Sequence, residues 1–129
     1  MYEYKCTIDR VIDGDTVDVF IDLGFDIIKA ERIRLLGIDT PELRSQDTVE
    51  KQAAQEAKDY VQGWFAAIER SGKDVYVRTS KSDKYGRYLG IIFYVDDVED
   101  NQAQFGKEVI LNQDLLDRGL AKEYYGGKR

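Results

Sequence analysis

The spacing of apolar residues changes once along the chain, and this change constrains the fold more than any other feature. Val17, Val19 and Ile21 lie on one side of a predicted strand at 16–21. Across residues 48–70 the apolar positions instead recur every three or four residues, which is typical of a helix with one buried face. Segments rich in β-branched and aromatic residues are found at 4–12, 16–21, 27–38, 74–79 and 87–95. The sequence therefore predicts three strands, a long helix and two further strands.

Local signals mark the ends of these elements. Asp13 and Gly14 predict a tight hairpin between the first two strands, because Asp-Gly favours the backbone angles of such turns. Asp47 is expected to cap the start of the long helix, with Glu50 three residues later as in a capping box. Gly72 is expected to end that helix.

The rest of the chain completes a small barrel. The polar stretch 96–104 is expected to be an exposed loop, and 112–118 a short helix. Five short strands with a helix between the third and the fourth suit a five-stranded Greek-key OB-fold, a mixed α+β fold that is mainly β. With 129 residues the chain has room for one such domain, spanning 1–129. This fold binds ligands on strands 2 and 3 and in the loops joining strands 1–2 and 4–5, here 13–15 and 80–87.

Two residue counts restrict the chemistry. The chain has no His, which excludes Ser-His and Cys-His nucleophilic sites, and one Cys, which excludes intramolecular disulfides and cysteine zinc clusters. Any catalysis must therefore use carboxylates, Arg, Lys, Tyr or hydroxyls. A bound metal would be a hard ion held by oxygen, such as calcium, magnesium or manganese. Cys6 is expected to be an inert thiol, and Tyr60, Trp64 and Phe65 to be core residues.

The charge balance does not favour non-specific binding to nucleic acid. The chain carries 19 basic and 25 acidic residues, a net charge of −6, whereas phosphate binding depends mostly on Lys and Arg. Local positive charge is available in the loop with Lys81, Lys84 and Arg87. No signal peptide or long apolar run is visible, so no membrane partner is expected. The protein is expected to be a monomer, cytoplasmic unless it is trimmed from a secreted precursor.

Three charged clusters contain the candidate site residues. They are Asp13-Gly14-Asp15-Thr16, Arg34 with Asp39-Thr40-Pro41-Glu42, and Asp83-Lys84-Tyr85-Gly86-Arg87. Each cluster alone is explained as a turn or as a solvated connection. The predicted barrel, however, places them near one another.

Two aspartates are expected to meet at one end of the barrel. Asp15 opens the second strand and Asp39 closes the third, so a hairpin of these strands brings both carboxylates to the same end. A divalent cation would offset their repulsion, with the Thr40 carbonyl as a further ligand. Glu42 lies just beyond, where it could hold or deprotonate a water molecule.

Two arginines would complete such a site. Arg34 lies about 16 Å before Asp39 along an extended strand, so only its long side chain or a strong twist would bring it to the cation. Arg87 would reach the same point from the loop joining strands 4 and 5. A cation, a carboxylate base and two guanidinium groups suit phosphodiester hydrolysis, because they offset the charge of the transition state and activate water.

These segments resemble those of the staphylococcal nuclease (thermonuclease) family. The resemblance rests on Asp13-Gly14-Asp15-Thr16-Val17, Arg34-Leu35-Leu36-Gly37-Ile38-Asp39-Thr40-Pro41-Glu42, Asp83-Lys84-Tyr85-Gly86-Arg87 and Gly119-Leu120-Ala121-Lys122. Their order and spacing match from about Tyr4 to Tyr125. The resemblance implies an OB-fold, calcium-dependent phosphodiesterase that hydrolyses DNA and RNA to 3′-phosphate products, with little sugar or base specificity.

The resemblance also implies a role for each residue at the metal. Asp15 and Asp39 would ligate Ca²⁺ through their carboxylates, and Thr40 through its carbonyl. Asp13 would support this site from behind, and Glu42 would be the general base.

The substrate contacts implied by the resemblance come from other segments. Arg34 and Arg87 would bind the scissile phosphate, and Lys84 would help to hold the terminal phosphate. Tyr85 would pack near the nucleotide, and Tyr125 would stack on it or form a hydrogen bond with it.

The chain also departs from the short secreted members of the family. Residues 96–107 are longer and more acidic than the equivalent hairpin, and no counterpart of those enzymes' C-terminal helix follows Tyr125. Two other functions stay open: an OB-fold module that binds nucleic acid or a protein without turnover, and a calcium-binding structural domain.

Overall fold

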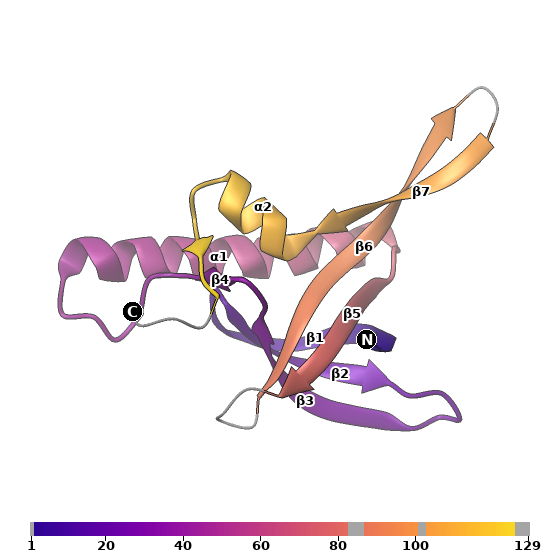
Figure 1. Ribbon diagram of the computed structural model, residues 1–129, viewed down its shortest axis with the longest axis horizontal. Coiled ribbons are helices and arrows are strands. Elements are labelled where there is room, and N and C mark those ends of the chain that lie inside the picture. The colour runs from indigo at the N-terminus through magenta and orange to yellow at the C-terminus, as the bar shows by residue number, and fades with distance from the viewer. Residues whose placement is uncertain (1, 83–86, 101–102, 126–129) are drawn as a thin grey trace.

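Five strands close into a barrel in the computed structural model (Figure 1). They are β1 (Tyr2–Asp13), β2 (Thr16–Asp22), β3 (Ile28–Leu35), β5 (Val75–Ser82) and β6 (Tyr88–Asp100). Antiparallel pairing joins β3, β2, β1, β5 and β6 in that order, and a parallel pairing of β3 with β6 closes the ring. The predicted OB-type barrel, mainly β with two helices, is confirmed.

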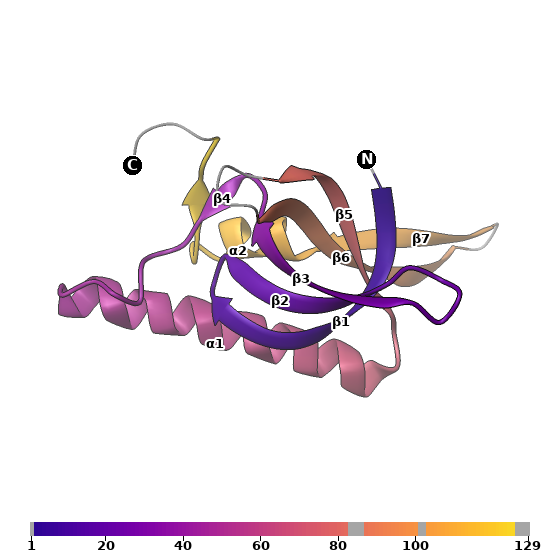
Figure 2. The same cartoon turned by 90° about the horizontal axis from the view of Figure 1, so that it is seen from below.

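The structure describes residues 2–82, 87–100 and 103–125, with the main chain alone at 80–82, 97–100 and 103–105. Within these ranges, two helices and three further strands complete the fold: β4 (Ile38–Asp39), α1 (Thr48–Ser71), β7 (Ala103–Ile110), α2 (Leu111–Asp117) and β8 (Lys122–Glu123). Figure 2 shows α1 lying along the outside of β1 and β2, with α2 near one end of the barrel. Among the described residues, no helix combines the length and the apolar character that a membrane span needs.

The long helix begins and ends where the local signals predict. The Asp47 side chain accepts hydrogen bonds from the main-chain N–H groups of Val49 and Glu50, and Gly72 takes the left-handed conformation (φ 76°) after the last turn. The capping box is not reciprocal, because the Glu50 carboxylate accepts a hydrogen bond from Ser45 Oγ at 2.8 Å instead of reaching back to Asp47. Glu50 therefore ties the segment before the helix to its first turn.

The core lies between the barrel interior and one face of α1. That face contributes a row of buried residues: Ala54, Ala57, Val61, Trp64, Phe65 and Ile68. Tyr60 is half-buried and its hydroxyl donates to the Asp114 carboxylate, which links α1 to α2. Cys6 is buried on β1, and this burial raises the pKa of its thiol to about 12. The expectation of an inert thiol and aromatic core residues is confirmed.

The expectation of an exposed loop at 96–104 is wrong for the described residues, 96–100 and 103–104. The antiparallel pairing of β6 with β7 runs from Phe93 opposite Ile110 to Asp100 opposite Ala103, and it forms an arm that projects from the barrel (Figure 1). The sequence of this segment is mostly polar, so it lacks the apolar alternation that reveals other strands. These polar residues form strands through main-chain pairing, which the composition of the segment does not reveal.

The hairpin between β1 and β2 lies very close to α1. A Cβ built on Gly14 would lie 2.7 Å from Ala57 Cβ and 3.0 Å from Thr40 Cγ2. By contrast, a Cβ on Gly63, at an exposed position of α1, would meet nothing within 4 Å. Gly14 is therefore required by packing, whereas Gly63 only weakens its helix.

We expect Gly14→Ala to lower the free energy of unfolding by about 1–3 kcal/mol, because the added methyl must push α1 or Thr40 away. Gly63→Ala is the matched control with the opposite sign, and should raise the free energy by about 0.5–1 kcal/mol through helix propensity. Urea denaturation of the two variants measures both effects. A Gly14→Ala variant as stable as the wild type would contradict the close approach.

Candidate functional site

A buried arginine joins two buried aspartates at one end of the barrel. Arg34 Nη1 lies 3.0 Å from Asp15 Oδ2, and Arg34 Nη2 lies 3.2 Å from Asp39 Oδ1. The three residues are only 5–6% exposed. The prediction that Asp15 and Asp39 meet at one end is confirmed, and the positive charge between them in this structure is a guanidinium group.

A turn that the sequence analysis did not predict brings these groups together. The expected single strand at 27–38 is wrong, because β3 ends at Leu35 and the chain turns at Gly37, which has a φ of 81°. The turn folds Asp39 back toward Arg34, so the two side chains are in contact and not separated by the length of an extended strand. The left-handed conformation favours glycine at this position.

A buried asparagine of α2 holds this turn. Asn112 Nδ2 donates to the carbonyl of Leu36 at 2.9 Å and to that of Gly90 at 3.1 Å, and its Oδ1 accepts from the Ile92 N–H at 3.2 Å. One side chain thus connects the turn after β3 to β6 at the point where the barrel closes. The sequence analysis missed Asn112, because a single polar residue in a short helix gives no signal of its contacts.

The Asp15 carboxylate has partners on both oxygens. Its Oδ2 accepts from the Thr40 N–H at 3.0 Å, and its Oδ1 accepts from Thr16 Oγ1 at 3.0 Å. Thr40 Oγ1, in contrast, is buried with no hydrogen-bond partner among the described residues. An unsatisfied buried hydroxyl is costly, and one beside two carboxylates indicates a place where a polar ligand would be favourable.

A pocket of about 420 Å³ opens beside these residues. Its charged and hydroxyl-bearing lining residues are Asp13, Asp15, Thr16, Arg34, Thr40, Glu42, Arg44 and Arg87. The structure therefore brings most of the predicted site residues to one pocket. Asp39 faces a second pocket of about 470 Å³, which shares Thr40 and Glu42 with the first. Lys84 and Tyr85, predicted to contact substrate, lie outside the described residues.

Asp13 lies in a mixed electrostatic environment. Burial, followed by the nearby Asp15 carboxylate, raises the pKa of Asp13 above its ordinary value, and Lys58, Arg44 and Arg34 oppose this rise. The sequence analysis did not select Lys58 or Arg44. No motif signals them, because their charges act on Asp13 only once the chain is folded.

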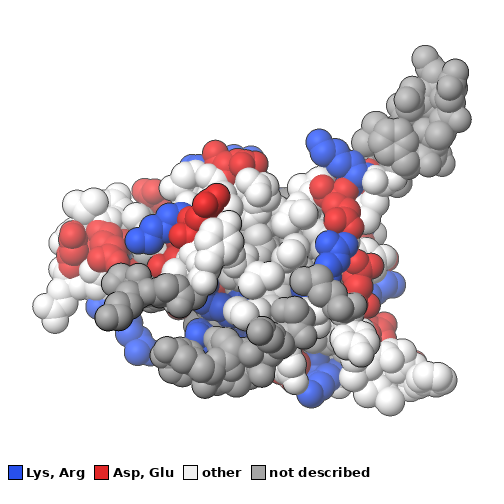
Figure 3. Space-filling view, viewed as in Figure 1, with Lys and Arg blue, Asp and Glu red and all other residues white. Residues whose placement is uncertain are grey.

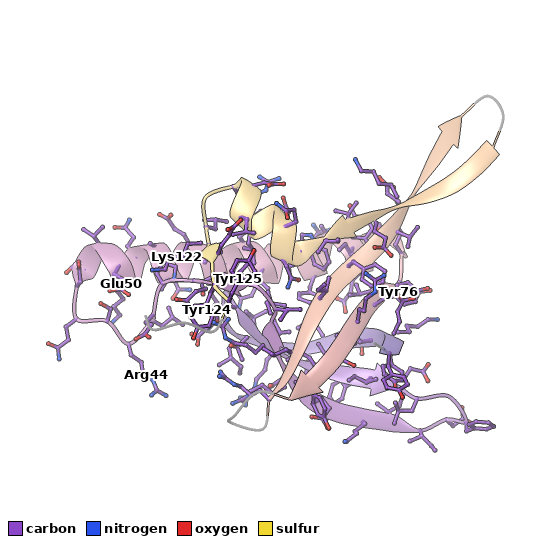
Figure 4. All side chains as sticks on the ribbon, in the orientation of Figure 1. Arg44, Glu50, Tyr76, Lys122, Tyr124 and Tyr125 are labelled. Carbon is purple, nitrogen blue, oxygen red and sulfur yellow. The ribbon has the colours of Figure 1, made fainter. Side chains whose placement is uncertain are left out.

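The tyrosines near the C-terminal end have different positions (Figure 4). Tyr125, predicted to contact the nucleotide, is 82% exposed beside the turn at Gly37 and does not line the 420 Å³ pocket. Tyr124 is half-buried, and its N–H donates to the Gly37 carbonyl at 2.9 Å. The Cζ atom of Arg34 lies 5.9 Å from the centre of the Tyr124 ring. Tyr124 therefore covers the guanidinium group that holds the two aspartates.

The donors at this site suit a hard cation. Among the described residues, no group of three or more His, Cys, Asp or Glu side chains is placed to hold a metal. Two carboxylates, those of Asp15 and Asp39, lie next to the main chain of Thr40 and its unsatisfied hydroxyl. Oxygen donors of this kind fit calcium or magnesium, with water molecules completing the coordination. Such a cation would share the carboxylates with Arg34.

Comparison with known proteins agrees with this geometry. A family model described as "Staphylococcal nuclease homologue" matches residues 32–129. The chain belongs to the staphylococcal nuclease family. The resemblance inferred from the charged clusters is therefore confirmed.

Several relatives in this family carry nuclease names. An "Uncharacterized endonuclease" of Escherichia coli O157:H7 is 36% identical over 96 residues, covering 72% of this chain and 50% of that protein. The "Thermonuclease" of Staphylococcus hyicus is 32% identical over 115 residues, covering 88% of this chain and 55% of that protein. The "Micrococcal nuclease" of Shigella flexneri is 28% identical over 127 residues, covering 98% of this chain and 62% of that protein. The chain thus spans about half to three-fifths of the length of these staphylococcal nuclease relatives.

We expect Arg34→Met to lower the free energy of unfolding by about 3–5 kcal/mol in chelator at pH 7, because it leaves two buried carboxylates without their shared partner. Arg32→Met is the control two residues earlier, where Arg32 Nε donates to the Asp18 carboxylate at 2.8 Å from a partly exposed position. Arg32→Met should lower the free energy of unfolding by only about 0–1 kcal/mol. Equal losses for the two variants, measured by urea denaturation, would show that the Arg34 pairs do not stabilise the fold.

Proposed function

We propose that this chain is a calcium-dependent nuclease that hydrolyses phosphodiester bonds in DNA and RNA, with little sugar or base specificity, and leaves 3′-phosphate products. One observation carries the proposal: Arg34, Arg87, Glu42 and Asp15 line one pocket in a chain of the staphylococcal nuclease family. Relatives of this chain are named thermonuclease and micrococcal nuclease, which supports the same reaction class.

The two arginines would bind the scissile phosphate. A guanidinium group donates two parallel hydrogen bonds to phosphate oxygens and stays charged at any pH of interest. Arg34 is already fixed by Asp15 and Asp39, so little side-chain entropy would be lost when it contacts the substrate. Arg87 is half-buried, lines the same pocket and would contact the phosphate from the position just before β6.

Asp15, Asp39 and the Thr40 carbonyl would hold the cation, and Asp13, whose carboxylate interacts with that of Asp15, would add negative potential that attracts it. When bound, the ion would polarise the phosphate and lower the pKa of a coordinated water. Asp15 and Asp39 would thus have two roles, because they also orient Arg34.

Glu42 would accept the proton from the attacking water. Its side chain is exposed at the pocket, so a water molecule can reach the carboxylate. Its main-chain N–H donates to Glu50 Oε1 at 3.4 Å, and the other oxygen of Glu50 accepts from Ser45 Oγ at 2.8 Å. The first turn of α1 therefore positions the segment that carries the proposed base.

The remaining substrate contacts would come from Lys84, Tyr85 and Tyr125. Lys84 would hold the terminal phosphate, and the tyrosines would pack near the nucleotide. The exposed position of Tyr125 leaves its ring available for stacking on a base.

The direct test is incubation of the protein with single-stranded DNA, double-stranded DNA and RNA, in calcium and then in chelator. We expect cleavage of all three in calcium and none in chelator. Binding without cleavage would instead indicate an OB-fold module without turnover. A rise in melting temperature with calcium, without binding or cleavage, would indicate a structural calcium site.

We expect Glu42→Gln to lower kcat by at least about 10²-fold, because the amide cannot accept the proton. Glu56→Gln, at an exposed position of α1, is the matched control and should keep the wild-type rate. Steady-state kinetics on a fluorescent oligonucleotide measure both.

Arg87→Lys should be nearly as damaging as Glu42→Gln, because an ammonium group lacks the bidentate guanidinium geometry. Arg70→Lys, at the exposed end of α1, controls for the substitution itself. Near-normal rates for both Glu42→Gln and Arg87→Lys would overturn the mechanism even if the wild type is active.

A further inference from the structure

The face of the sheet beside the pocket continues along β1, β2 and β3, which lie side by side (Figure 2). Thr16, at the start of β2, pairs with Asp13 of β1 and with Arg34 of β3, and all three residues line the 420 Å³ pocket. Side chains two residues apart on a strand point to the same side, so the next row on this face lies about 7 Å further along the sheet. No residue of that second row has a role in the proposed reaction.

The second row holds two arginines around one aspartate. Asp18 of β2 pairs with Arg10 of β1 and with Arg32 of β3. Arg10 Nε donates to Asp18 Oδ2 at 3.0 Å. Arg32 donates to the same carboxylate twice, from Nε to Oδ1 at 2.8 Å and from Nη2 to Oδ2 at 3.1 Å. Two guanidinium groups thus share one carboxylate, so these three side chains together carry one positive charge.

The arginines of this row face the solvent more than the aspartate does. The side chains of Arg10 and Arg32 are 64% and 44% exposed, whereas that of Asp18 is 16% exposed. A guanidinium group has five N–H donors, and the contacts with Asp18 use one donor of Arg10 and two of Arg32. Both arginines therefore keep N–H groups for an anionic ligand, while Asp18 holds their side chains in place.

Two irregularities in β1 put Arg10 into this row. The register of β1 with β2 shifts between Ile8 and Arg10, and again between Val11 and Asp13. A regular pairing that continued from Asp13 would place Val11 in the row and Arg10 opposite the buried Val19. Bulges of this kind are common next to active sites, where they redirect a side chain. In this chain they add a second guanidinium group to the face that leads away from the pocket.

The third row adds an aromatic ring. Phe20 of β2 pairs with Thr7 of β1 and with Ala30 of β3, and it is 39% exposed. Both of these neighbours are small, so neither can cover the ring. Proteins that bind a single nucleic-acid strand combine cations, which contact the phosphates, with aromatic rings on which bases stack. The second and third rows supply one of each, in line with the pocket.

The contacts that suit such a strand end with the third row. Further along β3, Lys29 is paired with Glu31 at 2.7 Å. The end of the β2–β3 hairpin, at the lower right of Figure 3, is mostly uncharged, and residues 23–28 include no Lys or Arg. Phe25, at this end, is 97% exposed. A bound strand would therefore find cations from the pocket to the second row, and none at the end of the hairpin.

We propose that Arg10, Arg32 and Phe20 form a track for a single polynucleotide strand whose scissile phosphate lies in the pocket. The two arginines bind a neighbouring phosphate, and Phe20 stacks on a base. This inference rests on the proposed nuclease function and deepens it, because it makes a single strand of several nucleotides the preferred substrate. An acidic protein that binds few phosphates gains affinity from each additional one. A dinucleotide, which has one internucleotide phosphate, does not reach the track.

The first test compares a thymidine dinucleotide with a ten-residue oligothymidylate as substrates in calcium. Arg10→Gln/Arg32→Gln should reduce kcat/KM on the longer substrate by at least about tenfold, the effect of removing one charged hydrogen bond. The kcat/KM of this variant on the dinucleotide should stay within about twofold of the wild-type value. For the longer substrate, the plot of log kcat/KM against log salt should flatten by about 0.7, because one phosphate contact is lost.

Two further variants separate the track from net charge and from folding. Arg70→Gln/Lys107→Gln changes the net charge by the same amount at exposed positions on the far end of α1 and on β7, and it should match the wild type on both substrates. Arg10→Lys/Arg32→Lys keeps both charges and should retain most of the activity on the longer substrate.

The second test concerns the aromatic ring. Phe20→Ala should reduce kcat/KM on the oligothymidylate by at least about fivefold, the lower end of what one stacked base contributes. Phe20→Tyr keeps a ring and should restore the wild-type value. On a duplex, whose bases already stack on one another, Phe20→Ala should change kcat/KM by less than about twofold. Phe25→Ala removes an exposed ring beyond the track, and it should leave both substrates unaffected.

A loss on the dinucleotide equal to that on the longer substrate, or an equal loss in the Arg70→Gln/Lys107→Gln control, would overturn the track while leaving the nuclease function intact. Equal effects of Phe20→Ala and Phe25→Ala would likewise overturn the stacking role of Phe20. A wild-type protein that cleaves neither substrate would instead overturn the proposed function, and the inference with it.

Discussion

The contact of Arg34 with Asp15 and Asp39 is the interaction on which the site depends. These three groups are buried, and buried charges persist only when they are paired and hydrogen-bonded. The pairing joins the start of β2, the end of β3 and β4, so it fixes three separate segments relative to one another. The same carboxylates that balance the arginine are those that we propose to hold a cation, which couples the stability of this end of the barrel to its proposed chemistry.

The rest of the fold supports this contact from two sides. On one side α1 packs against the hairpin at Gly14, so closely that a methyl group would not fit, and its first turn holds the segment that carries Glu42. On the other side α2 presents Asn112 to the turn after β3 and to β6. The helices are therefore more than a cover for the core, because each positions a part of the pocket.

The fold could be predicted wherever one face of an element is buried. The period of the apolar residues and the caps at Asp47 and Gly72 located α1 to within a residue, because burial and capping act through nearby positions in the sequence. The arm of β6 and β7 was predicted as a loop, since its mostly polar sequence carries no periodic apolar signal. The break at Gly37 was missed for a related reason: the residues on both sides of it are apolar, so the pattern continues through the turn.

By itself the sequence determined the family, the chemical types available to the site and the residues at its centre, because short motifs such as Asp13-Gly14-Asp15 are local and their order is a property of the chain. Only the tertiary structure decided that Arg34 lies between the two aspartates, that Asn112 and Tyr124 fix the turn beside them, and that Arg44 lines the same pocket. The physical reason is that these contacts join segments far apart in the sequence, and their geometry follows from the closure of the barrel and the packing of the helices.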